Sequence, residues 1–196
     1  MRACQILSAV VLFLSLAILG QSSSVQKASP KQSASTKNAQ LRALPASVLD
    51  TELKAVDGSS FWLSNYSGKL LVVNLWATWC APCRTQIHSL VKLHKQFESQ
   101  GLEIVGLSTE ARRDSDEVVR EIVSDFAVSY KIGWATPAVT MALMQGRDAI
   151  PQTFVISPSG RIVKRFVGFN SKFTPAQVKE AIEEALNEKS NLPEPE

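Results

Sequence analysis

The feature that most constrains the fold of this chain is an apolar segment followed at once by a helical pattern. Residues 70–77 read LLVVNLWA, a run that is too short for a typical helix and rich in residues that favour strands. Such a run suits a strand that is buried on both faces of a sheet. From Pro82 onward the apolar positions follow a 3.6-residue period, and they are Cys83, Ile87, Leu90, Val91, His94 and Phe97. The pattern predicts a buried strand followed by an amphipathic helix that Gly101 closes.

The later segments extend this pair into an α/β domain. LEIVGLS predicts a second buried strand, and strand, helix and strand together form the unit that produces parallel pairing. Asp114 and Glu117 are predicted to cap the next helix. VSYKIGW then predicts a short strand, and Thr136-Pro137 predicts the start of another helix. TFVIS and RIVKRFVGF predict a β-hairpin before a last helix that opens near Thr174. A mixed central sheet flanked by helices is the expected architecture.

The two ends of the chain differ in composition from its centre. Residues 1–22 combine an early arginine, an apolar stretch and small polar residues, which is the layout of a secretory signal peptide. The apolar stretch falls short of the roughly 18 residues of a spanning helix, so cleavage is favoured and an uncleaved membrane anchor is the alternative. Residues 23–44 are predicted to form a flexible linker and residues 189–196 a disordered tail. The globular domain is expected over residues 45–188.

The charge and the N-terminal pattern limit the classes of partner. The net charge is only +3, and the lysines and arginines are scattered rather than gathered in a stripe with aromatic residues. Nucleic acid is therefore not expected as a partner. The signal-like N-terminus predicts an exported protein, either periplasmic or secreted, or tethered by its N-terminus to a membrane and facing the periplasm. We expect it to act as a monomer.

Two of the three cysteines, Cys80 and Cys83, flank the predicted strand-to-helix junction. A zinc site normally needs a second pair of ligands, and His88 and His94 are six residues apart, which does not present two imidazoles to one ion. We therefore expect no metal and no cofactor. A purely structural disulfide between Cys80 and Cys83 would stabilise the fold little, because closing so short a loop removes little conformational entropy from the unfolded chain.

Redox chemistry has a positive physical case. Cys80 falls at the first turn of the helix, where free backbone N–H groups and the helix dipole favour a thiolate. Cys83 lies one turn further on the buried face, where it is placed to attack a mixed disulfide formed at Cys80. Pro82 fixes the backbone between the sulfurs without costing a helical hydrogen bond. Trp79 is either an ordinary aromatic residue or a flat apolar rest for an incoming peptide.

The segment NLWATWCAPC resembles the active-site segment of the thioredoxin superfamily. Together with the signal sequence and AIPQTFVI, it makes residues 45–188 similar to the exported thiol–disulfide oxidoreductases of the TlpA/ResA type. The resemblance implies a thioredoxin-like fold with an N-terminal β extension and a central insertion. It also implies a cis proline at Pro151, opposite the cysteine pair, with Ile150 offering backbone hydrogen bonds to substrate. An X-Pro bond ahead of a strand is a plausible cis site, although the residues alone favour a trans proline that starts an edge strand.

The chain departs from this resemblance at the residues around the cysteine pair. Thioredoxin carries a buried aspartate where this chain has Asn74, and the exported proteins often carry a glutamate and a proline where it has Gln86 and His88. No carboxylate therefore stands at either usual place to take a proton from the resolving thiol. We expect Asn74 and Gln86 to tune the redox pair and His88 to be a solvated surface residue. Glu110, just after the second strand, is either another acid or an ordinary loop carboxylate.

The expected function is thiol–disulfide exchange on protein disulfides outside the cytoplasm, with Cys80 as nucleophile and Cys83 as resolving thiol. The resemblance implies a reductase that a membrane thiol transducer supplies with electrons and whose clients include apocytochromes awaiting haem in cytochrome c maturation. One alternative is a non-catalytic thioredoxin-fold module that binds peptides and keeps a permanent disulfide. The other is a peroxiredoxin-like peroxidase, which is disfavoured because Thr78 stands two residues before Cys80 instead of three.

Overall fold

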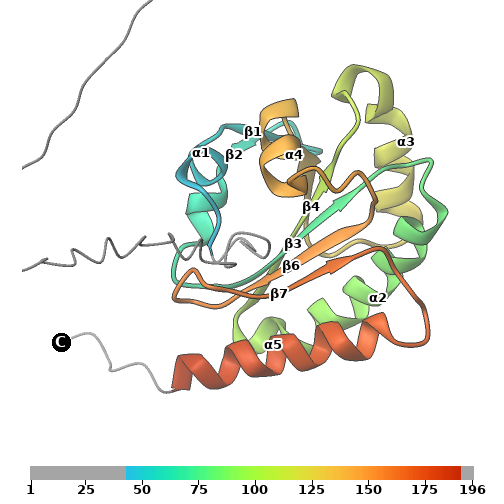
Figure 1. The fold of residues 1–196 in the computed structure, drawn as a ribbon. Helices are drawn as coiled ribbons and strands as arrows, with labels where there is room; N and C mark the ends of the chain where they lie inside the picture. Colours follow the sequence, from blue (N-terminus) through green and yellow to red (C-terminus); the bar gives the residue numbers. More distant parts are fainter. Residues whose placement is uncertain (1–42, 191–196) are drawn as a thin grey trace, which may run out of the picture. The chain divides into compact units, whose positions relative to one another are not determined.

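A seven-stranded sheet between helices forms the part of the chain that the computed structural model describes, residues 43–190 (Figure 1). The expected signal peptide (1–22), nearly all of the linker (23–44) and most of the tail (189–196) lie outside the described residues, so these divisions stay predictions. No helix within residues 43–190 is long and apolar enough to cross a membrane. The elements follow in the order α1 (Ala46–Leu49), β1 (Leu53–Ala55), β2 (Ser60–Phe61), η2 (Leu63–Tyr66), β3 (Leu70–Trp76), α2 (Ala81–Phe97), η3 (Glu98–Gln100), β4 (Leu102–Ser108), α3 (Arg112–Asp125), β5 (Lys131–Trp134), α4 (Pro137–Met144), β6 (Gln152–Ile156), β7 (Ile162–Val167) and α5 (Thr174–Ser190).

The strand order of the sheet is β2-β1-β5-β4-β3-β6-β7. β3 pairs in parallel with β4, and β4 pairs in parallel with β5. β6 pairs antiparallel with both β3 and β7, and the β1–β2 hairpin joins the sheet antiparallel to β5. These pairings confirm the mixed sheet, and the hairpin is the expected N-terminal β extension.

The central strand β3 is covered on both faces of the sheet. Helices α2, α3 and α5 pack on one face, and α1 and α4 pack on the other (Figure 1). Successive side chains of a strand point to opposite faces, so Leu70 and Val72 belong to the core beneath α2 and α5, whereas Leu71 and Val73 belong to the core beneath α1 and α4. All seven residues of β3 are buried, which explains why its sequence is apolar without alternation.

Most elements agree with the sequence patterns that predicted them. β3 ends at Trp76 and α2 begins at Ala81, which confirms the strand-to-helix junction around the cysteine pair. The chain turns after α2 and η3 at Gly101, whose φ is 90°. The predicted hairpin is β6–β7, and α3 and β5 form the central insertion between β4 and the segment that leads to Pro151.

The predicted capping pair of the third helix is wrong. α3 begins at Arg112 and its N-cap is Ala111, which makes no side-chain cap hydrogen bond. Asp114 lies inside the first turn, where the helix dipole also favours an acidic residue. The acidic pattern therefore marked the correct end of the helix but not the capping residue.

Candidate active site

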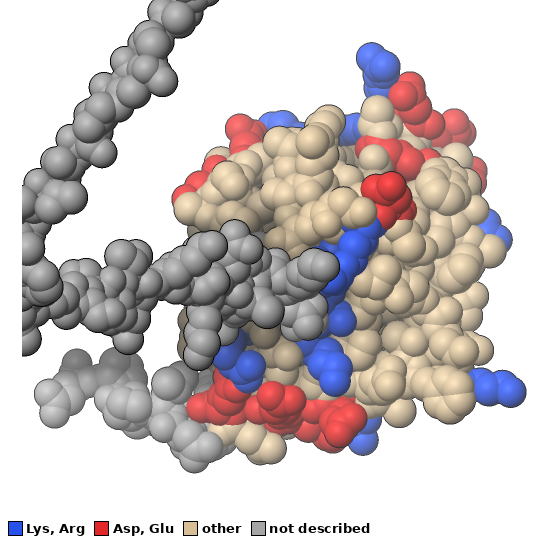
Figure 2. All heavy atoms as spheres, in the orientation of Figure 1, with Lys and Arg blue, Asp and Glu red and all other residues tan. Residues whose placement is uncertain are grey.

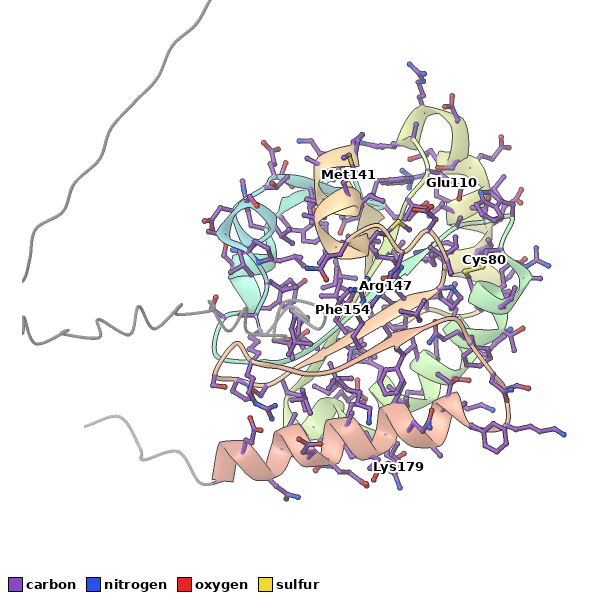
Figure 3. The ribbon with its side chains drawn as sticks, viewed as in Figure 1. Cys80, Glu110, Met141, Arg147, Phe154 and Lys179 are labelled. Carbon is purple, nitrogen blue, oxygen red and sulfur yellow. A yellow bond between two sulfur atoms is a disulfide. The ribbon has the colours of Figure 1, made fainter. Side chains whose placement is uncertain are left out.

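Cys80 and Cys83 lie where β3 gives way to α2, at the carboxyl end of the central parallel strands (Figure 3). Cys80 is the N-cap of α2, and the backbone N–H of Cys83 donates a hydrogen bond of 3.3 Å to its sulfur. The two residues form a disulfide, with Cα atoms 5.2 Å apart. The sulfur of Cys80 thus occupies the place where a side chain caps the free N–H groups of a helix, and the same N–H groups and the helix dipole stabilise a thiolate there.

The two cysteines are buried to different degrees: Cys83 lies in the core as expected, and Cys80 is more buried than the sequence suggested. Cys80 exposes 5% of its surface and Cys83 exposes none. Both belong to a core cluster that also contains Trp76 and Trp134, and Ile150 packs against this cluster. The position of Cys80 at a helix start does not reveal this burial, because the distant Ile150, which packs beside it, is 70 residues away in the sequence. An approach to the disulfide from solvent therefore leads to Cys80.

The Ile150–Pro151 segment faces Cys80 across the site. The carbonyl oxygen of Ile150 lies 3.9 Å from the sulfur of Cys80, and the Ile150–Pro151 peptide bond is cis. The residues alone favoured a trans proline at the start of an edge strand, but β6 is not an edge strand, since it lies between β3 and β7. The structure therefore brings together four of the residues singled out from the sequence, namely the two cysteines, Ile150 and Pro151.

The side chains of Trp79 and Pro82 lie on the solvent side of the cysteine pair. Trp79 exposes 73% of its surface, so it is not a core residue, and Pro82 is exposed in the first turn of α2. An exposed indole next to Cys80 offers apolar area to a docking polypeptide. A role for either residue in binding remains a proposal.

Gln86, which lies one turn after Cys83 on α2, forms a buried network of neutral polar groups with Asn74 and Thr153. Asn74 Nδ2 donates hydrogen bonds to Gln86 Oε1 at 2.9 Å and to Thr153 Oγ1 at 3.1 Å. Gln86 Nε2 also donates to Thr153 Oγ1, at 2.9 Å. Asn74 Oδ1 is buried without a hydrogen-bond partner among the described residues. The amide pair predicted to tune the site therefore exists as a contact, and it carries no charge.

Glu110 has a role that the sequence did not identify. Its carboxylate accepts a hydrogen bond of 2.6 Å from the backbone N–H of Thr78 and one of 2.8 Å from the Thr78 hydroxyl, and Ser108 donates a third at 3.3 Å. Glu110 follows β4 and Thr78 follows β3, and the parallel pairing of these strands brings the two residues together. Glu110 therefore anchors the segment that leads into Trp79 and Cys80.

The buried Gln152 beside Pro151 and its partly buried partner Arg165 were also missed. Gln152 is fully buried at the start of β6 and contacts Arg165 on β7. The signal that could have found this pair is a glutamine that directly precedes the apolar run TFVI of a predicted strand. His88, in contrast, is exposed as expected, and its ring stacks on Phe126 with ring centroids 4.1 Å apart.

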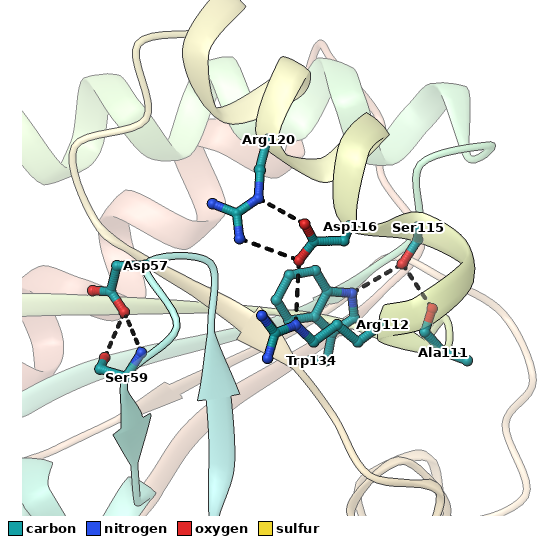
Figure 4. Close-up of polar contacts among 8 residues, drawn as sticks. All are labelled: Asp57, Ser59, Ala111, Arg112, Ser115, Asp116, Arg120 and Trp134. Carbon is teal, nitrogen blue, oxygen red and sulfur yellow. Dashed lines mark hydrogen bonds and ion pairs between the residues drawn. The ribbon is translucent and has the colours of Figure 1, made fainter.

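A polar cluster ties α3 to β5 beside the cysteine core (Figure 4). The indole Nε1 of Trp134 donates to Ser115 Oγ at 2.9 Å, and Arg112 stacks on the Trp134 ring with its guanidinium carbon 5.2 Å from the centroid. Asp116 accepts from Arg112 and Arg120, and the hydrogen bond from Arg120 is the main cause that lowers the pKa of Asp116. Trp134 shares a core cluster with Cys80 and Cys83, so this network fixes one wall of the site.

No group of three or more histidine, cysteine, aspartate or glutamate side chains within residues 43–190 is placed to hold a metal ion. The arrangement that these residues do form can exchange a disulfide: one sulfur at a helix N-terminus on the solvent side, and one behind it within the core.

Comparisons with known proteins agree with this chemistry. The family model described as the AhpC/TSA family matches residues 45–165. The thiol-disulfide oxidoreductase ResA of Bacillus subtilis is 32% identical over 121 residues, which cover 59% of this chain and 63% of that protein. The thiol:disulfide interchange protein HelX of Rhodobacter capsulatus is 34% identical over 101 residues, or 52% of this chain and 53% of that protein. The chain thus spans less than two thirds of either relative.

A solved structure matches over a larger share of its length. The thiol:disulfide interchange protein of Chlorobium tepidum TLS, a thioredoxin family protein, superposes with a TM-score of 0.62 at 30% identity. The match covers 76% of this chain and 99% of that one. The described fold is therefore a thioredoxin-like fold.

Proposed function

This chain belongs to the AhpC/TSA family, and from that premise we propose that it is a thiol–disulfide oxidoreductase that reduces protein disulfides through Cys80 and Cys83. The observation that carries the proposal is the asymmetric disulfide at the N-terminus of α2, with Cys80 on the solvent side and Cys83 inside the core. A purely structural disulfide does not require one sulfur on the solvent side and the other in the core. The names of the relatives, ResA and HelX among them, point to the same reaction class.

The reaction starts from the reduced cysteines. The Cys80 thiolate attacks one sulfur of the client disulfide, the client S–S bond breaks, and the leaving client thiolate takes a proton. Cys83 then loses its proton and attacks the Cys80 sulfur, which breaks the mixed disulfide, forms the Cys80–Cys83 bond and releases the second client thiolate. Two electrons have passed from the protein to the client. An external dithiol must return them before the next cycle.

The position of each partner residue gives it a role in this cycle. Trp79, Pro82, Ile150 and Pro151 border Cys80 and form the surface on which a client strand docks. The Ile150 carbonyl, 3.9 Å from the Cys80 sulfur, is placed to accept a hydrogen bond from the client backbone.

Gln86 lies one turn after Cys83 on α2 and is hydrogen-bonded to Asn74, and both side chains are neutral. The Cys83 proton then leaves without help from a carboxylate at either of these positions.

The electron donor and the compartment follow from the resemblance and from the N-terminal sequence. We propose an extracytoplasmic location, with the N-terminus either cleaved or retained as a membrane tether. Thiols are oxidised by default in such a compartment, so a reductase there depends on a dedicated donor. A membrane protein that carries a dithiol fits this need. Apocytochromes, whose haem-binding cysteines must be reduced, are the proposed clients.

The proposed function is tested by replacing each cysteine. Cys80→Ala should abolish the reduction of insulin disulfides by the protein in the presence of dithiothreitol, because no thiolate remains to attack. Cys83→Ala should also stop turnover but should accumulate mixed disulfides through Cys80, since the resolving thiol is missing. Capture of these adducts in the native host would identify the clients. An unchanged rate for Cys80→Ala would refute the proposal.

A redox titration against glutathione separates the proposal from a non-catalytic module with a permanent disulfide. Structural disulfides have midpoints below roughly −300 mV. A midpoint well below that value would favour the binding module, and rapid, saturable consumption of peroxide would favour a peroxidase.

A further inference from the structure

We propose that Gln152 and Arg165 are positioning residues that hold the segment before Pro151 so that the Ile150 carbonyl stands opposite Cys80 when a client docks. The proposal rests on the proposed function and deepens it. It predicts that this pair determines how well the protein handles polypeptide disulfides, which need the Ile150 backbone, as opposed to small disulfides, which do not.

Gln152 follows Pro151 and is fully buried, with both ends of its amide in use. Its Nε2 atom donates to the carbonyl oxygens of Arg147, at 2.6 Å, and of Ala149, at 2.8 Å. Its Oε1 atom accepts a hydrogen bond of 2.5 Å from Arg165 Nη2. One side chain therefore fixes two backbone carbonyls in the three residues that precede Ile150.

Arg165 extends this contact to the end of α4. Its Nη2 atom also donates to the carbonyl oxygen of Met144 at 2.7 Å, and its Nη1 atom donates to Gln145 Oε1 at 3.0 Å. The guanidinium carbon lies 5.1 Å from the centroid of the Phe154 ring. Gln145 has a positive φ of 50°, so the chain leaves α4 in a turn, and Arg165 holds both sides of it. Figure 3 labels two residues of this region, Arg147 and Phe154.

The energetics of Arg165 suggest that its benefit is geometric. No ion pair joins it to a carboxylate within residues 43–190, and its Nε atom is buried without a partner. Burial is the main cause that lowers its pKa, and the nearby Arg147 adds to it. Arg165 is only partly buried, but a guanidinium that loses some of its hydration without gaining a counter-ion is a poor source of stability. The three acceptors that its planar fork reaches explain why a guanidinium stands there.

Gln152 and Arg165 together fix the backbone that leads to Ile150. The segment from Met144 to Ala149 is held at four groups, and on the other side the N–H of Gly168 donates to the Pro151 carbonyl at 2.7 Å. Ile150 is thereby held between two anchored stretches of chain. A backbone acceptor that is already in place when the client arrives does not have to be ordered during binding, which favours attack by Cys80.

The test compares two disulfide substrates with variants at both positions. Gln152→Met and Arg165→Met keep the approximate side-chain volume and remove the hydrogen bonds. We expect kcat/KM for insulin reduction to fall about tenfold, because the docked strand is less well placed. We expect the reduced variants to react with the small disulfide 5,5′-dithiobis(2-nitrobenzoic acid) at the wild-type rate, and the glutathione midpoint to be unchanged. Arg165→Lys should behave like Arg165→Met, because one ammonium group cannot reach all three acceptors.

Lys164 provides the matched control. It is the neighbouring basic residue on β7, and it is exposed. Figure 2 shows a narrow band of basic side chains on one face of the molecule. Lys164→Met removes the same charge from the same strand and should leave both rates unchanged. Urea unfolding shows whether each variant is folded, and Arg165→Lys, which keeps the charge and one donor group, carries the test if a methionine variant does not fold.

Three outcomes would overturn the inference. The first is an equal loss with both disulfides, which would mean that the thiolate or the whole fold was damaged. The second is an unchanged rate with insulin in folded variants. The third is a wild-type protein that reduces neither disulfide, which overturns the proposed function and this inference with it. A loss that is confined to insulin supports the inference and leaves the chemistry of Cys80 intact.

Discussion

Asn74 and Gln86, two fully buried side chains on β3 and α2, are joined by a hydrogen bond of 2.9 Å between amide groups. Their common partner, the hydroxyl of Thr153, accepts a hydrogen bond from each. Three neutral groups thus hydrogen-bond one another where a carboxylate would carry a negative charge, and only Asn74 Oδ1 lacks a partner among the described residues. Neither position carries a carboxyl group. These two residues therefore add no pH dependence to the free energy of unfolding.

Gln86→Glu should make the stability of the protein fall with rising pH. Burial raises the pKa of the new carboxyl group above the value of about 4.3 that it has in the unfolded chain. The folded protein then holds the proton more tightly than the unfolded chain does. Stability is therefore fully present below pH 4.3 and falls by up to about 1.4 kcal/mol per pH unit until the folded-state pKa is passed.

Urea unfolding of Gln86→Glu and of the wild type between about pH 4 and pH 8 measures this slope. Gln177→Glu, which places the same charge on the exposed face of α5, is the control and should follow the wild type. A Gln86→Glu variant that runs parallel to the wild type at every pH would show that the site is wetter than its burial indicates.

Asp57 should stabilise the folded protein at neutral pH and lose this contribution in acid. Its carboxylate accepts hydrogen bonds from the hydroxyl and the N–H of Ser59, and Lys131 lies 3.0 Å away, which together lower its pKa from 3.8. A carboxyl group with a lowered pKa contributes stability above its unfolded pKa and loses it as the pH falls through the folded value. Asp57→Asn should therefore reduce the acid-induced loss of stability below pH 3.8. Identical unfolding curves for both proteins in acid would contradict this.

Gly133→Ala should destabilise the protein more than Gly106→Ala. A Cβ atom on Gly133 would lie 2.5 Å from the backbone oxygen of Lys54 and 2.9 Å from a ring carbon of Phe61. On Gly106 it would lie 2.5 Å from the terminal carbon of Ile132, which can move. The β1–β2 hairpin has to shift in the first case, so we expect a loss of about 2–3 kcal/mol in the free energy of unfolding. Equal losses would mean that the hairpin is held loosely.

Much of the fold was predictable because its signals are local. The apolar run of β3 and the 3.6-residue period of α2 each lie within one element, and their junction fixes where Cys80 and Cys83 stand. The Pro137 start of α4, after its Thr136 cap, was readable for the same reason. Such patterns depend on burial and backbone geometry, which neighbouring residues determine.

The contacts around the cysteines were not predictable because they join distant parts of the chain. Glu110 and Thr78 are 32 residues apart, and Asn74 and Thr153 are 79 apart. Nothing near Glu110 in the sequence shows that its carboxylate meets a backbone N–H on another strand. The cover that Ile150 gives to Cys80 was hidden in the same way.

Glu110 should be necessary for the stability of the segment before Cys80. Its carboxylate accepts two hydrogen bonds from Thr78, at 2.6 Å and 2.8 Å, and hydrogen bonds to a charged group contribute more than neutral ones. Glu110→Ala leaves the Thr78 N–H without this acceptor, so we expect the free energy of unfolding to fall by about 2 kcal/mol. Glu110→Gln keeps one acceptor and should lose less. Insulin reduction should slow in the same order, because Trp79 and Cys80 follow directly.

Glu103 is the control for Glu110, because its carboxylate forms an ordinary surface ion pair and does not contact Thr78. It pairs with Lys69 at 2.9 Å on the surface, and such pairs contribute at most about 1 kcal/mol. Glu103→Ala removes a carboxylate from the adjacent strand β4 without touching the segment before Cys80, so urea unfolding and insulin reduction should both stay near the wild-type values. If Glu110→Ala were as mild as Glu103→Ala in both measurements, the segment would be held by the core packing of Trp76 and the cysteines, and the contact with Thr78 would be incidental.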